Sequence, residues 1–297
     1  MIHNLKEMRT ITSVILSGKE PAAKVREKVR KELAERAITP RLVVVMIGNN
    51  PASQAYVNGK KRDCEECGIG FELIHLSENS TQENVMSLIK RLNASNVVDG
   101  ILVQLPIPRH LDKDAIIKAI DPCKDVDCFC EENLGRLFLN RPMFEPCTPS
   151  GIIDLMSFYG IDVVGKHCVI IGRSDIVGKP LATMLINYGA TVTVCNSHTQ
   201  DLKSITQSAD IIVCAVGKSK FLTADMIREG AIVIDVGINK GEDGKLCGDV
   251  DFDDVKNKAG AITPVPGGVG LMTRAALMKN IVKATYGSVA YRVGAPD

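Results

Sequence analysis

The chain has 297 residues, which is enough for about two domains of roughly 150 residues each. Its 36 basic and 35 acidic residues leave a net charge of +1, and only 4% of the residues are aromatic. Neither a basic surface nor an aromatic platform for nucleic acid is therefore expected. The sequence contains no apolar run of membrane-spanning length and no signal-peptide pattern. We expect a cytoplasmic protein that binds neither nucleic acid nor membrane.

The ten cysteines are expected to be reduced thiols, because no secretory signal accompanies them. Three of them fall in apolar runs, where cysteine acts as a small core residue: Cys168, Cys195 and Cys214. Cys64 and Cys67 could join Cys128 and Cys130 in a four-thiolate zinc site if the fold brought them together. A Cys-x-Cys pair departs from the usual second Cys-x-x-Cys pair of such sites, so no metal is predicted.

The first half of the chain alternates between helical and strand patterns. Its expected elements are a helix over 21–37, a strand over 42–47, a helix containing 53–60, a strand over 71–76, a helix from a capping box at 80–83 through 92, and a strand that begins near 99 and ends at Gln104. The segment 124–137 has the composition of a loop. Two prolines and a glycine within 146–151 predict a linker between domains.

The second half begins with a strand, a glycine-containing loop and a helix, the first unit of a dinucleotide-binding fold. In chain order the expected elements are a strand over 167–171, the loop 172–180, a helix over 181–188, strands over 191–195, 211–216 and 231–236, a hairpin turn at 241–244, a strand over 261–263 and a helix over 273–286. We thus predict an α/β protein in which domain 1–146 precedes a Rossmann-like domain, 147–273, with a doubly wound parallel sheet. Residues 274–297 are expected to pack back onto the first domain.

A hydroxyl, a phenol and an amine share one face of the helix that contains 53–60. Ser53 precedes Tyr56 by three residues and Tyr56 precedes Lys60 by four, and such spacings make helical neighbours. The helix follows an apolar strand, and catalytic groups in open α/β sheets gather at the carboxyl ends of strands. Taken alone, a Tyr-x-x-x-Lys pattern is more often a solvated lysine beside a packed tyrosine, so the rest of the sequence must decide.

The loop after the first strand of the second domain has features of a phosphate-binding loop. Gly172 and Gly178 can let the backbone approach a pyrophosphate, and the start of the following helix supplies amide donors. The spacing is not Gly-x-Gly-x-x-Gly, so a doubly wound domain without a nucleotide is the alternative. The next strand leads into Asn196 and Ser197 instead of the acidic residue that NAD sites use, and Arg173 lies in the loop. This pattern favours NADP over NAD.

Taken together, these motifs closely resemble those of the bifunctional methylenetetrahydrofolate dehydrogenase/cyclohydrolases of one-carbon metabolism. The resembling segments are 48–60, 99–108, 125–127, 146–151, 172–180, 235–239, 248–251 and 264–270. The resemblance implies a catalytic, folate-binding domain followed by a nucleotide domain, with folate in the cleft and a homodimer formed through the nucleotide domain. It also implies oxidation of 5,10-methylenetetrahydrofolate to the methenyl compound with NADP. Hydrolysis of that product would give 10-formyltetrahydrofolate, which serves purine biosynthesis.

By position in these motifs, the resemblance implies roles for individual residues. The expected catalytic residues are Lys60, its partner Gln104, the aromatic Tyr56 against the folate, and Asp127, which holds the pterin. Further substrate contacts are expected from Ser53, Pro266, Gly267 and Gly268. The expected cofactor contacts are Gly172, Arg173, Ser174, Gly178, Ser197 and Ile238.

The chemistry of the reaction fits these roles. Removal of a hydride from the one-carbon bridge leaves a cation that a protonated lysine would oppose, whereas burial favours the neutral form of Lys60. The Gln104 amide can hold the lysine nitrogen without adding charge. Neutral Lys60 can then assist attack of water on the methenyl carbon, while Asp127 accepts hydrogen bonds from the pterin.

The chain departs from the family pattern at three places. Cys128-Phe129-Cys130 stands where many relatives have Gly-Phe-His, Asn196 replaces a histidine, and Leu271 replaces a proline. These changes affect the expected substrate affinity and loop geometry more than the class of reaction. Three alternatives remain open. They are a protein with only one of the two activities, a short-chain dehydrogenase, whose Tyr-x-x-x-Lys would lie downstream of the glycine loop, and a non-catalytic nucleotide- or metal-binding protein.

Overall fold

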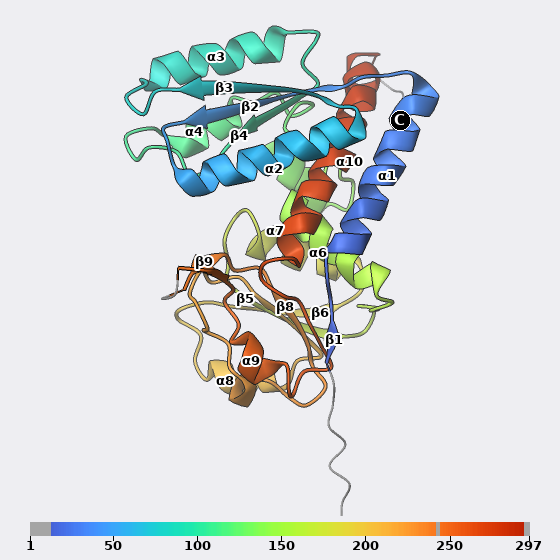
Figure 1. Cartoon of the computed structure of the whole chain (residues 1–297), viewed down its shortest axis with the longest axis vertical. Coiled ribbons are helices and arrows are strands. Elements are labelled where there is room, and N and C mark those ends of the chain that lie inside the picture. The colour runs from blue at the N-terminus through green and yellow to red at the C-terminus, as the bar shows by residue number, and fades with distance from the viewer. Residues whose placement is uncertain (1–12, 242–243, 294–297) are drawn as a thin grey trace, which may run out of the picture.

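The computed structural model describes residues 13–241 and 244–293, which form two α/β domains stacked along the long axis of the molecule (Figure 1). The first domain contains three parallel strands in the order β3-β2-β4: β2 (Arg41–Ile47), β3 (Gly70–Leu76) and β4 (Gly100–Val103). Its helices are α2 (Pro51–Cys67), α3 (Gln82–Ala94), α4 (Lys113–Lys118) and α5 (Glu131–Phe138). The strands predicted for this half of the chain are all present.

Strand β2 is the centre of this sheet and is buried on both faces. Leu42, Val44 and Met46 pack in one apolar cluster with α2, whereas Val43 and Val45 pack in another with α3. Side chains alternate across a strand, so a central parallel strand covered by helices on both sides needs a continuous apolar run. The helices therefore sandwich the sheet and leave its carboxyl edge free for a site.

The second domain is built on six parallel strands in the order β1-β11-β8-β7-β5-β6. They are β1 (Val14–Ile15), β5 (His167–Ile171), β6 (Thr191–Cys195), β7 (Ile211–Cys214), β8 (Ile232–Asp235) and β11 (Ala261–Ile262). Around them lie α7 (Gly178–Asn187), α8 (Leu202–Gln207), α9 (Phe252–Val255), a 3-10 turn (Ala224–Met226) and a hairpin of β9 (Asn239–Lys240) and β10 (Leu246–Cys247). The predicted fold class, α/β with a doubly wound parallel sheet, is confirmed.

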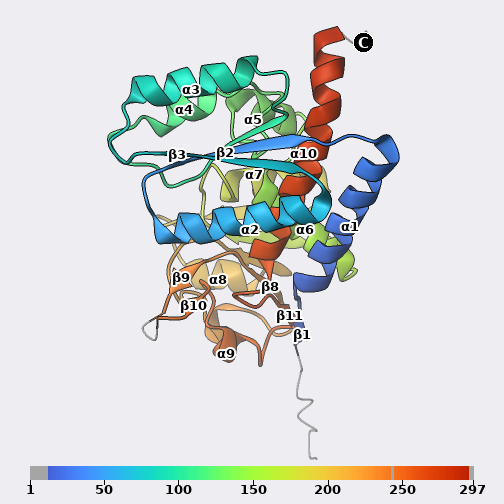
Figure 2. The same cartoon turned by 45° about the horizontal axis from the view of Figure 1, so that its top comes forward.

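Three helices and one short strand link the two domains. Strand β1 lies near the start of the chain, yet it pairs with β11 of the second sheet. Helices α1 (Lys19–Arg36) and α10 (Val269–Val293) both run from the second domain toward the first, beside α6 (Cys147–Phe158) (Figure 1, Figure 2). Apolar residues of α10 complete the core of the first domain, among them Leu277, Ile281 and Val282. The division of the chain at 146/147 stays a prediction.

Two sequence predictions, the capping box at 80–83 and the linker at 146–151, are wrong. The capping box begins at Thr81 instead of Ser80, because the Oγ1 of Thr81 accepts a hydrogen bond from the Asn84 amide at 3.2 Å. Residues 146–151 are not a linker, since α6 begins at Cys147. Proline is tolerated in a first helical turn because the amides there have no partner within the helix.

The segment predicted to be a loop, 124–137, contains most of α5. The buried carboxylate of Asp125 fixes the start of this helix by accepting from the amides of Phe129 and Cys130, both at 2.9 Å. Asn133 of the helix also donates to this carboxylate, at 3.1 Å. The start signal therefore comes from a side chain six residues upstream, which local sequence patterns do not reveal.

Two further points concern the predicted hairpin turn and membrane-spanning helices. The hairpin turn predicted at 241–244 includes residues 242 and 243, which lie outside the described residues, although the strands β9 and β10 on either side are paired. Within the described ranges, none of the helices combines the length and the apolar character needed to cross a bilayer.

Candidate active site

The side chain of Lys60 is buried where α2 meets the end of β4. Lys60 is 5% exposed, and its Nζ donates a hydrogen bond to the Oε1 of Gln104 at 3.1 Å. The same nitrogen lies 5.7 Å from the centre of the Tyr56 ring. Gln104 is itself held, because its Nε2 donates to the carbonyl oxygen of Leu105 at 2.8 Å. The amide oxygen of Gln104 is therefore turned toward the lysine.

The first turn of α2 is fixed to the end of β4. Asn50 caps the helix by accepting from two backbone amides, at 3.0 and 3.1 Å, and Pro51 occupies the first helical position. The hydroxyl of Ser53 donates to the carbonyl oxygen of Leu105 at 3.3 Å. Ser53 thus ties the helix to the same loop that holds Gln104.

A cavity of about 190 Å³ brings the predicted catalytic residues together. It is lined by Tyr56, Lys60, Gln104, Leu105, Asp127, Phe129, Cys147, Thr148, Ile176, Thr273 and Leu277. All four residues that the resemblance implies to be catalytic are in this set. Burial raises the pKa of the Tyr56 phenol, so this ring stays neutral. The cavity thus presents one amine, one carboxylate and several neutral polar groups.

Three polar residues of this cavity were not predicted: Cys147, Thr148 and Thr273. Cys147 is buried at the start of α6, where its thiol donates to the carbonyl oxygen of Val126 at 3.4 Å, and burial raises the pKa of this thiol well above the usual value. The thiol is therefore a neutral hydrogen-bond donor. Thr273 of α10 donates to the hydroxyl of Thr148 at 3.1 Å. Reading 146–151 as a helix start would have pointed to two of the three.

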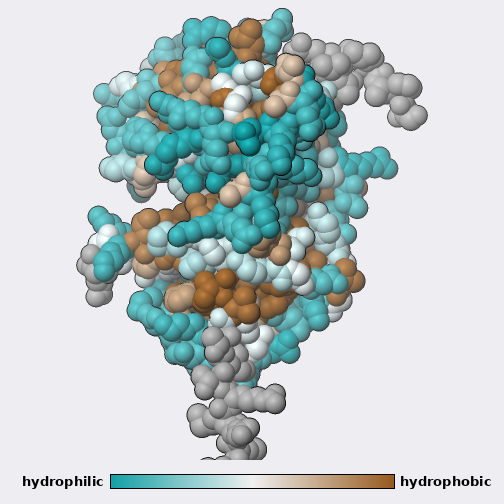
Figure 3. Space-filling model, turned by 45° about the vertical axis from the view of Figure 1, so that its right-hand side comes forward, coloured by the Kyte–Doolittle hydropathy of each residue, from teal (hydrophilic) through white to brown (hydrophobic). Residues whose placement is uncertain are grey.

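A larger cavity, of about 440 Å³, shares Tyr56 with the first. It lies between the domains, where the space-filling view shows a hollow with apolar surface along the side of the second domain (Figure 3). The opposite wall belongs to α2 and α10 and carries Arg62 and Arg274. Apart from Tyr56 on α2, the predicted substrate and cofactor residues that line this cavity lie on the side of the second domain: Pro266, Gly267, Gly268 and Ile238.

Glycines shape the loop between β5 and α7. Gly172 has a φ of +124°, and a side chain there would collide with the carbonyl oxygen of Ala215. A side chain at Gly178 would collide with the backbone of Gly172. The Oγ of Ser174 accepts from the amides of Val177 and Gly178, at 3.2 and 3.4 Å. This close-packed backbone at the start of a helix fits the pyrophosphate of a dinucleotide.

Arg173 and Ser197 are exposed beyond the carboxyl ends of two neighbouring strands. Strands β5 and β6 are paired, with Ile171 opposite Cys195, so the loops that follow them start side by side. No acidic residue occupies 196–199, where an NAD site would place one. A guanidinium beside a hydroxyl suits a phosphate monoester.

Two buried aspartates, for which no role was predicted, fix the loop that carries Ile238. Asp235 accepts from three backbone amides, each at 2.9 Å. Asp249 accepts from the amides of Val216 and Gly217, at 2.6 and 2.9 Å. Burial raises the pKa of Asp235 to about 6, and the nearby charge of Asp249 adds to this effect. The pair holds the ends of β7 and β8 against the cavity wall.

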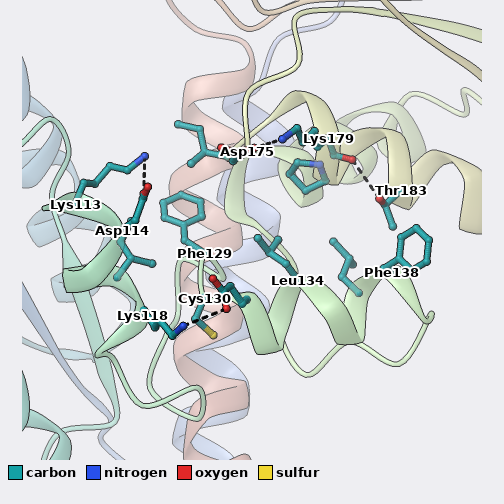
Figure 4. A pocket seen from close by; sticks show the side chains of 15 residues that line it. Lys113, Asp114, Lys118, Phe129, Cys130, Leu134, Phe138, Asp175, Lys179 and Thr183 are labelled. Carbon is teal, nitrogen blue, oxygen red and sulfur yellow. Dashed lines mark hydrogen bonds and ion pairs between the residues drawn. The ribbon is translucent and has the colours of Figure 1, made fainter.

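A third cavity, of about 430 Å³, lies between α4, α5 and α7 (Figure 4). It shares Phe129 and Ile176 with the smallest cavity. Its lysines are all paired with carboxylates: Lys113 with Asp114 at 3.2 Å, Lys118 with Glu131 at 3.6 Å, and Lys179 with Asp175 at 2.5 Å. Because these charges cancel, the cavity does not select a charged ligand.

In the part of the chain that the structure describes, no three His, Cys, Asp or Glu side chains come together as a metal site. The four-thiolate site considered for Cys64, Cys67, Cys128 and Cys130 therefore has no support. Burial raises the pKa of each of these thiols, which disfavours the thiolate that binds metal.

A close-packed glycine loop follows a strand of one parallel sheet, and a buried lysine and a carboxylate share a cavity at the other domain. This arrangement is typical of a two-domain nucleotide-dependent enzyme. Residues 16–127 match the catalytic domain of the tetrahydrofolate dehydrogenase/cyclohydrolases, and residues 146–288 match their NAD(P)-binding domain. The chain belongs to the tetrahydrofolate dehydrogenase/cyclohydrolase family, as its motifs predicted.

Relatives of the family match nearly the whole chain. A bifunctional protein FolD of Acetivibrio thermocellus is 50% identical over 273 residues, which are 91% of this chain and 96% of the relative. The bifunctional FolD methylenetetrahydrofolate dehydrogenase/cyclohydrolase of Campylobacter jejuni has a solved structure with 49% identity and a TM-score of 0.90, covering 93% of this chain and 99% of that one. The Trypanosoma brucei enzyme, solved with NADP cofactor and an inhibitor, has 37% identity and a TM-score of 0.89, covering 93% and 98%.

Proposed function

We propose that this protein oxidises 5,10-methylenetetrahydrofolate to 5,10-methenyltetrahydrofolate with NADP and hydrolyses the product to 10-formyltetrahydrofolate. The observation that carries the proposal is the buried Lys60 amine, held by the neutral Gln104 in a cavity that also contains Asp127. Tyr56 also lines the larger cavity, whose other wall is formed by loops of the nucleotide domain. One site can therefore serve both reactions.

The residues of the small cavity divide the work of binding and proton transfer. Asp127 accepts hydrogen bonds from the amino and imino groups of the pterin, and Tyr56 covers its ring system. The amine of Lys60 donates one hydrogen bond to Gln104 and can meet a water molecule in the same cavity. When that water attacks the methenyl carbon, Lys60 accepts a proton from it. The bond between this carbon and N5 of the folate then breaks, N5 takes a proton back from Lys60, and the hydroxyl proton leaves to solvent, so that the formyl group stays on N10.

The residues of the second domain hold the dinucleotide. The loop from Gly172 to Gly178 takes the pyrophosphate, and Arg173 with Ser197 takes a 2′-phosphate. The bound dinucleotide supplies the hydride acceptor for the first reaction. Ile238 borders the space where the nicotinamide and the substrate meet. These placements favour NADP over NAD.

A substitution of Lys60 tests the hydrolytic half of the proposal. Purified Lys60→Met is given 5,10-methenyltetrahydrofolate, and loss of its absorbance is followed. We expect turnover to fall at least about 100-fold, the contribution typical of a general base. The control is Lys61→Met, because Lys61 is exposed and pairs only loosely with Glu65, at 3.9 Å. Full turnover by Lys60→Met would contradict the role given to this amine.

We further propose a homodimer formed through the nucleotide domain. Apolar side chains are exposed at the end of α7 and on the adjoining edge strand β6, namely Ile186 (60%), Tyr188 (46%) and Val194 (38%). Contact between two copies would remove this surface from water. Light scattering should give twice the mass of the chain, and Val194→Lys should shift the mass toward that of one chain. A monomeric unaltered protein would contradict this proposal.

The state of the cysteines bears on where in the cell the protein works. Nine of the ten cysteines are buried thiols, and all ten are unbridged, which suits a reducing compartment. We propose that the protein works in the cytoplasm, where its product would supply formyl groups for purine biosynthesis. Fractionation of cells that carry a tagged chain would test the location.

A further inference from the structure

We infer that Arg62 and Arg274 bind the carboxylates of the glutamate tail of the folate substrate, in a groove along α2. This inference rests on the proposed function and adds a part of the site to which no role has been given above. Both arginines line the 440 Å³ cavity on the side of the first domain. The tail of a folate is the acidic part of the molecule, and a guanidinium matches a carboxylate with two parallel hydrogen bonds.

The groove is produced by the side-chain pattern of α2. Ala52, Ala55, Gly59 and Arg62 follow one another at spacings of three, four and three residues, so they form one stripe on the helix. Ala52 and Ala55 have small side chains and leave space above the helix, whereas Arg62 closes the far end. Arg62 is exposed and is free to turn toward a ligand in this space.

Arg274 reaches the same groove because residue 59 is glycine. A Cβ at Gly59 would collide with the Nη1 of Arg274, so the guanidinium occupies the place of the missing side chain. The Nε of Arg274 lies 3.2 Å from the Oδ2 of Asp63, a buried carboxylate one turn further along α2. This pair holds the guanidinium in a side chain that also lines the cavity.

The charges around Asp63 do not cancel. The carboxylate of Asp63 also lies 3.9 Å from the Nε of Arg26 in α1, and Arg26 is 2.8 Å from Glu66. Arg62 acts on Asp63 through its charge as well. The lining of the groove itself holds two guanidiniums, Arg62 and Arg274, and one carboxylate, Asp235 on the opposite wall, so one positive charge is in excess. The groove differs in this respect from the cavity between α4, α5 and α7, where every lysine is paired.

The distance along α2 from Tyr56 to Arg62 fits the length of the glutamate tail of the substrate. Tyr56 lines both cavities, so a ligand whose ring system lies beside Lys60 enters the groove past this residue. From Tyr56 to Arg62 the helix rises about 9 Å, at 1.5 Å for each residue. An aminobenzoyl-glutamate chain has about the length of three extended residues, roughly 10 Å. Its carboxylates would therefore arrive at the arginines when the pterin is in place.

Two substrates that differ only in the tail test the inference. The dehydrogenase reaction is measured with 5,10-methylenetetrahydrofolate, which has one glutamate, and with 5,10-methylenetetrahydropteroate, which has none. For Arg62→Gln we expect the KM for the first substrate to rise about tenfold, equivalent to about 1.4 kcal/mol, with kcat and the KM for NADP unchanged. The KM for the second substrate should not change, and Arg62→Lys should recover part of the loss. Lys61→Gln is the matched control on the same helix.

The possible outcomes separate this inference from the proposed function. An equal rise in KM for both substrates, or no rise for either, would overturn the role of the arginines while leaving the enzyme activity established. The rise should also shrink at high salt, because charge pairs at an open groove are screened. Absence of turnover by the unaltered protein with either substrate would overturn the proposed function and this inference with it.

Discussion

The amine of Lys60 and the side-chain oxygen of Gln104 lie 3.1 Å apart inside the molecule, although 44 residues separate them in the chain. The partner of this lysine is a neutral amide instead of a carboxylate. A carboxylate would favour the protonated amine, which cannot accept a proton from water. The hydrogen bond to Gln104 therefore orients the lysine and leaves it able to act as a base.

Replacement of Gln104 by glutamate tests this reading of the pair. Gln104→Glu keeps the shape of the side chain but places a negative charge beside Lys60. We expect the hydrolysis of methenyltetrahydrofolate to slow about 10- to 100-fold near neutral pH, because the new carboxylate would form an ion pair with the nitrogen that has to accept the proton. An unchanged rate of hydrolysis would show that a neutral partner for Lys60 is not needed.

Replacement of Arg173 tests the preference for NADP. Arg173→Ala should raise the KM for NADP at least about tenfold and leave the KM for NAD nearly unchanged, because only the 2′-phosphate needs the guanidinium. Lys203→Ala is a suitable control, since Lys203 is exposed and pairs with Asp225 away from the loop. The same loss for both cofactors would mean that Arg173 does not read the 2′-phosphate.

A pair of glycine substitutions tests the dinucleotide cradle. In Gly178→Ala the new methyl group meets the backbone of Gly172, which cannot move away as a side chain can, so we expect a loss of at least about 2 kcal/mol in the free energy of unfolding and weak NADP binding. Gly135→Ala adds the same methyl group to exposed α5, where no atom lies within 4 Å. This control should be neutral or more stable by up to about 1 kcal/mol. Equal effects of the two changes would contradict the steric argument.

The raised pKa of Asp235 predicts a pH dependence of stability. Burial raises this pKa from 3.8 to about 6, so the folded protein binds the proton more tightly than the unfolded chain. The contribution of Asp235 to stability is then greatest at low pH and is lost as the pH rises through 6. In urea unfolding, the difference in the free energy of unfolding between the unaltered protein and Asp235→Asn should grow by about 1 kcal/mol from pH 7 to pH 5. A difference that does not change with pH would contradict this assignment.

The sequence predicts those parts of the fold whose signals are local. The run from Leu42 to Ile47 is apolar on both faces and is a central strand, and the strand, glycine loop and helix around Gly172 form the expected unit. Helix α5 was not predicted because its start depends on the side chain of Asp125. The start of α6 was not predicted because its prolines are equally typical of a linker. Signals that depend on a distant partner are invisible in a local window.

The candidate site shows the same limit. The predicted cluster of Tyr56 and Lys60 lies on one helix, so its spacing reveals it. Cys147 and Thr273 reach the cavity from two other helices, and only the packing of α6 against α10 brings them there. The function of Gly59 is equally hidden, because it depends on Arg274, 215 positions further along the chain.

The most direct test of the proposed function is a spectroscopic assay of the purified protein with 5,10-methylenetetrahydrofolate, run in parallel with NADP and with NAD. Reduced cofactor and the methenyl compound are followed together. We predict rapid reduction of NADP, slower reduction of NAD, and consumption of the methenyl compound faster than its hydrolysis in buffer. No reduction of either cofactor would contradict the proposal and leave only the fold and the family assignment standing.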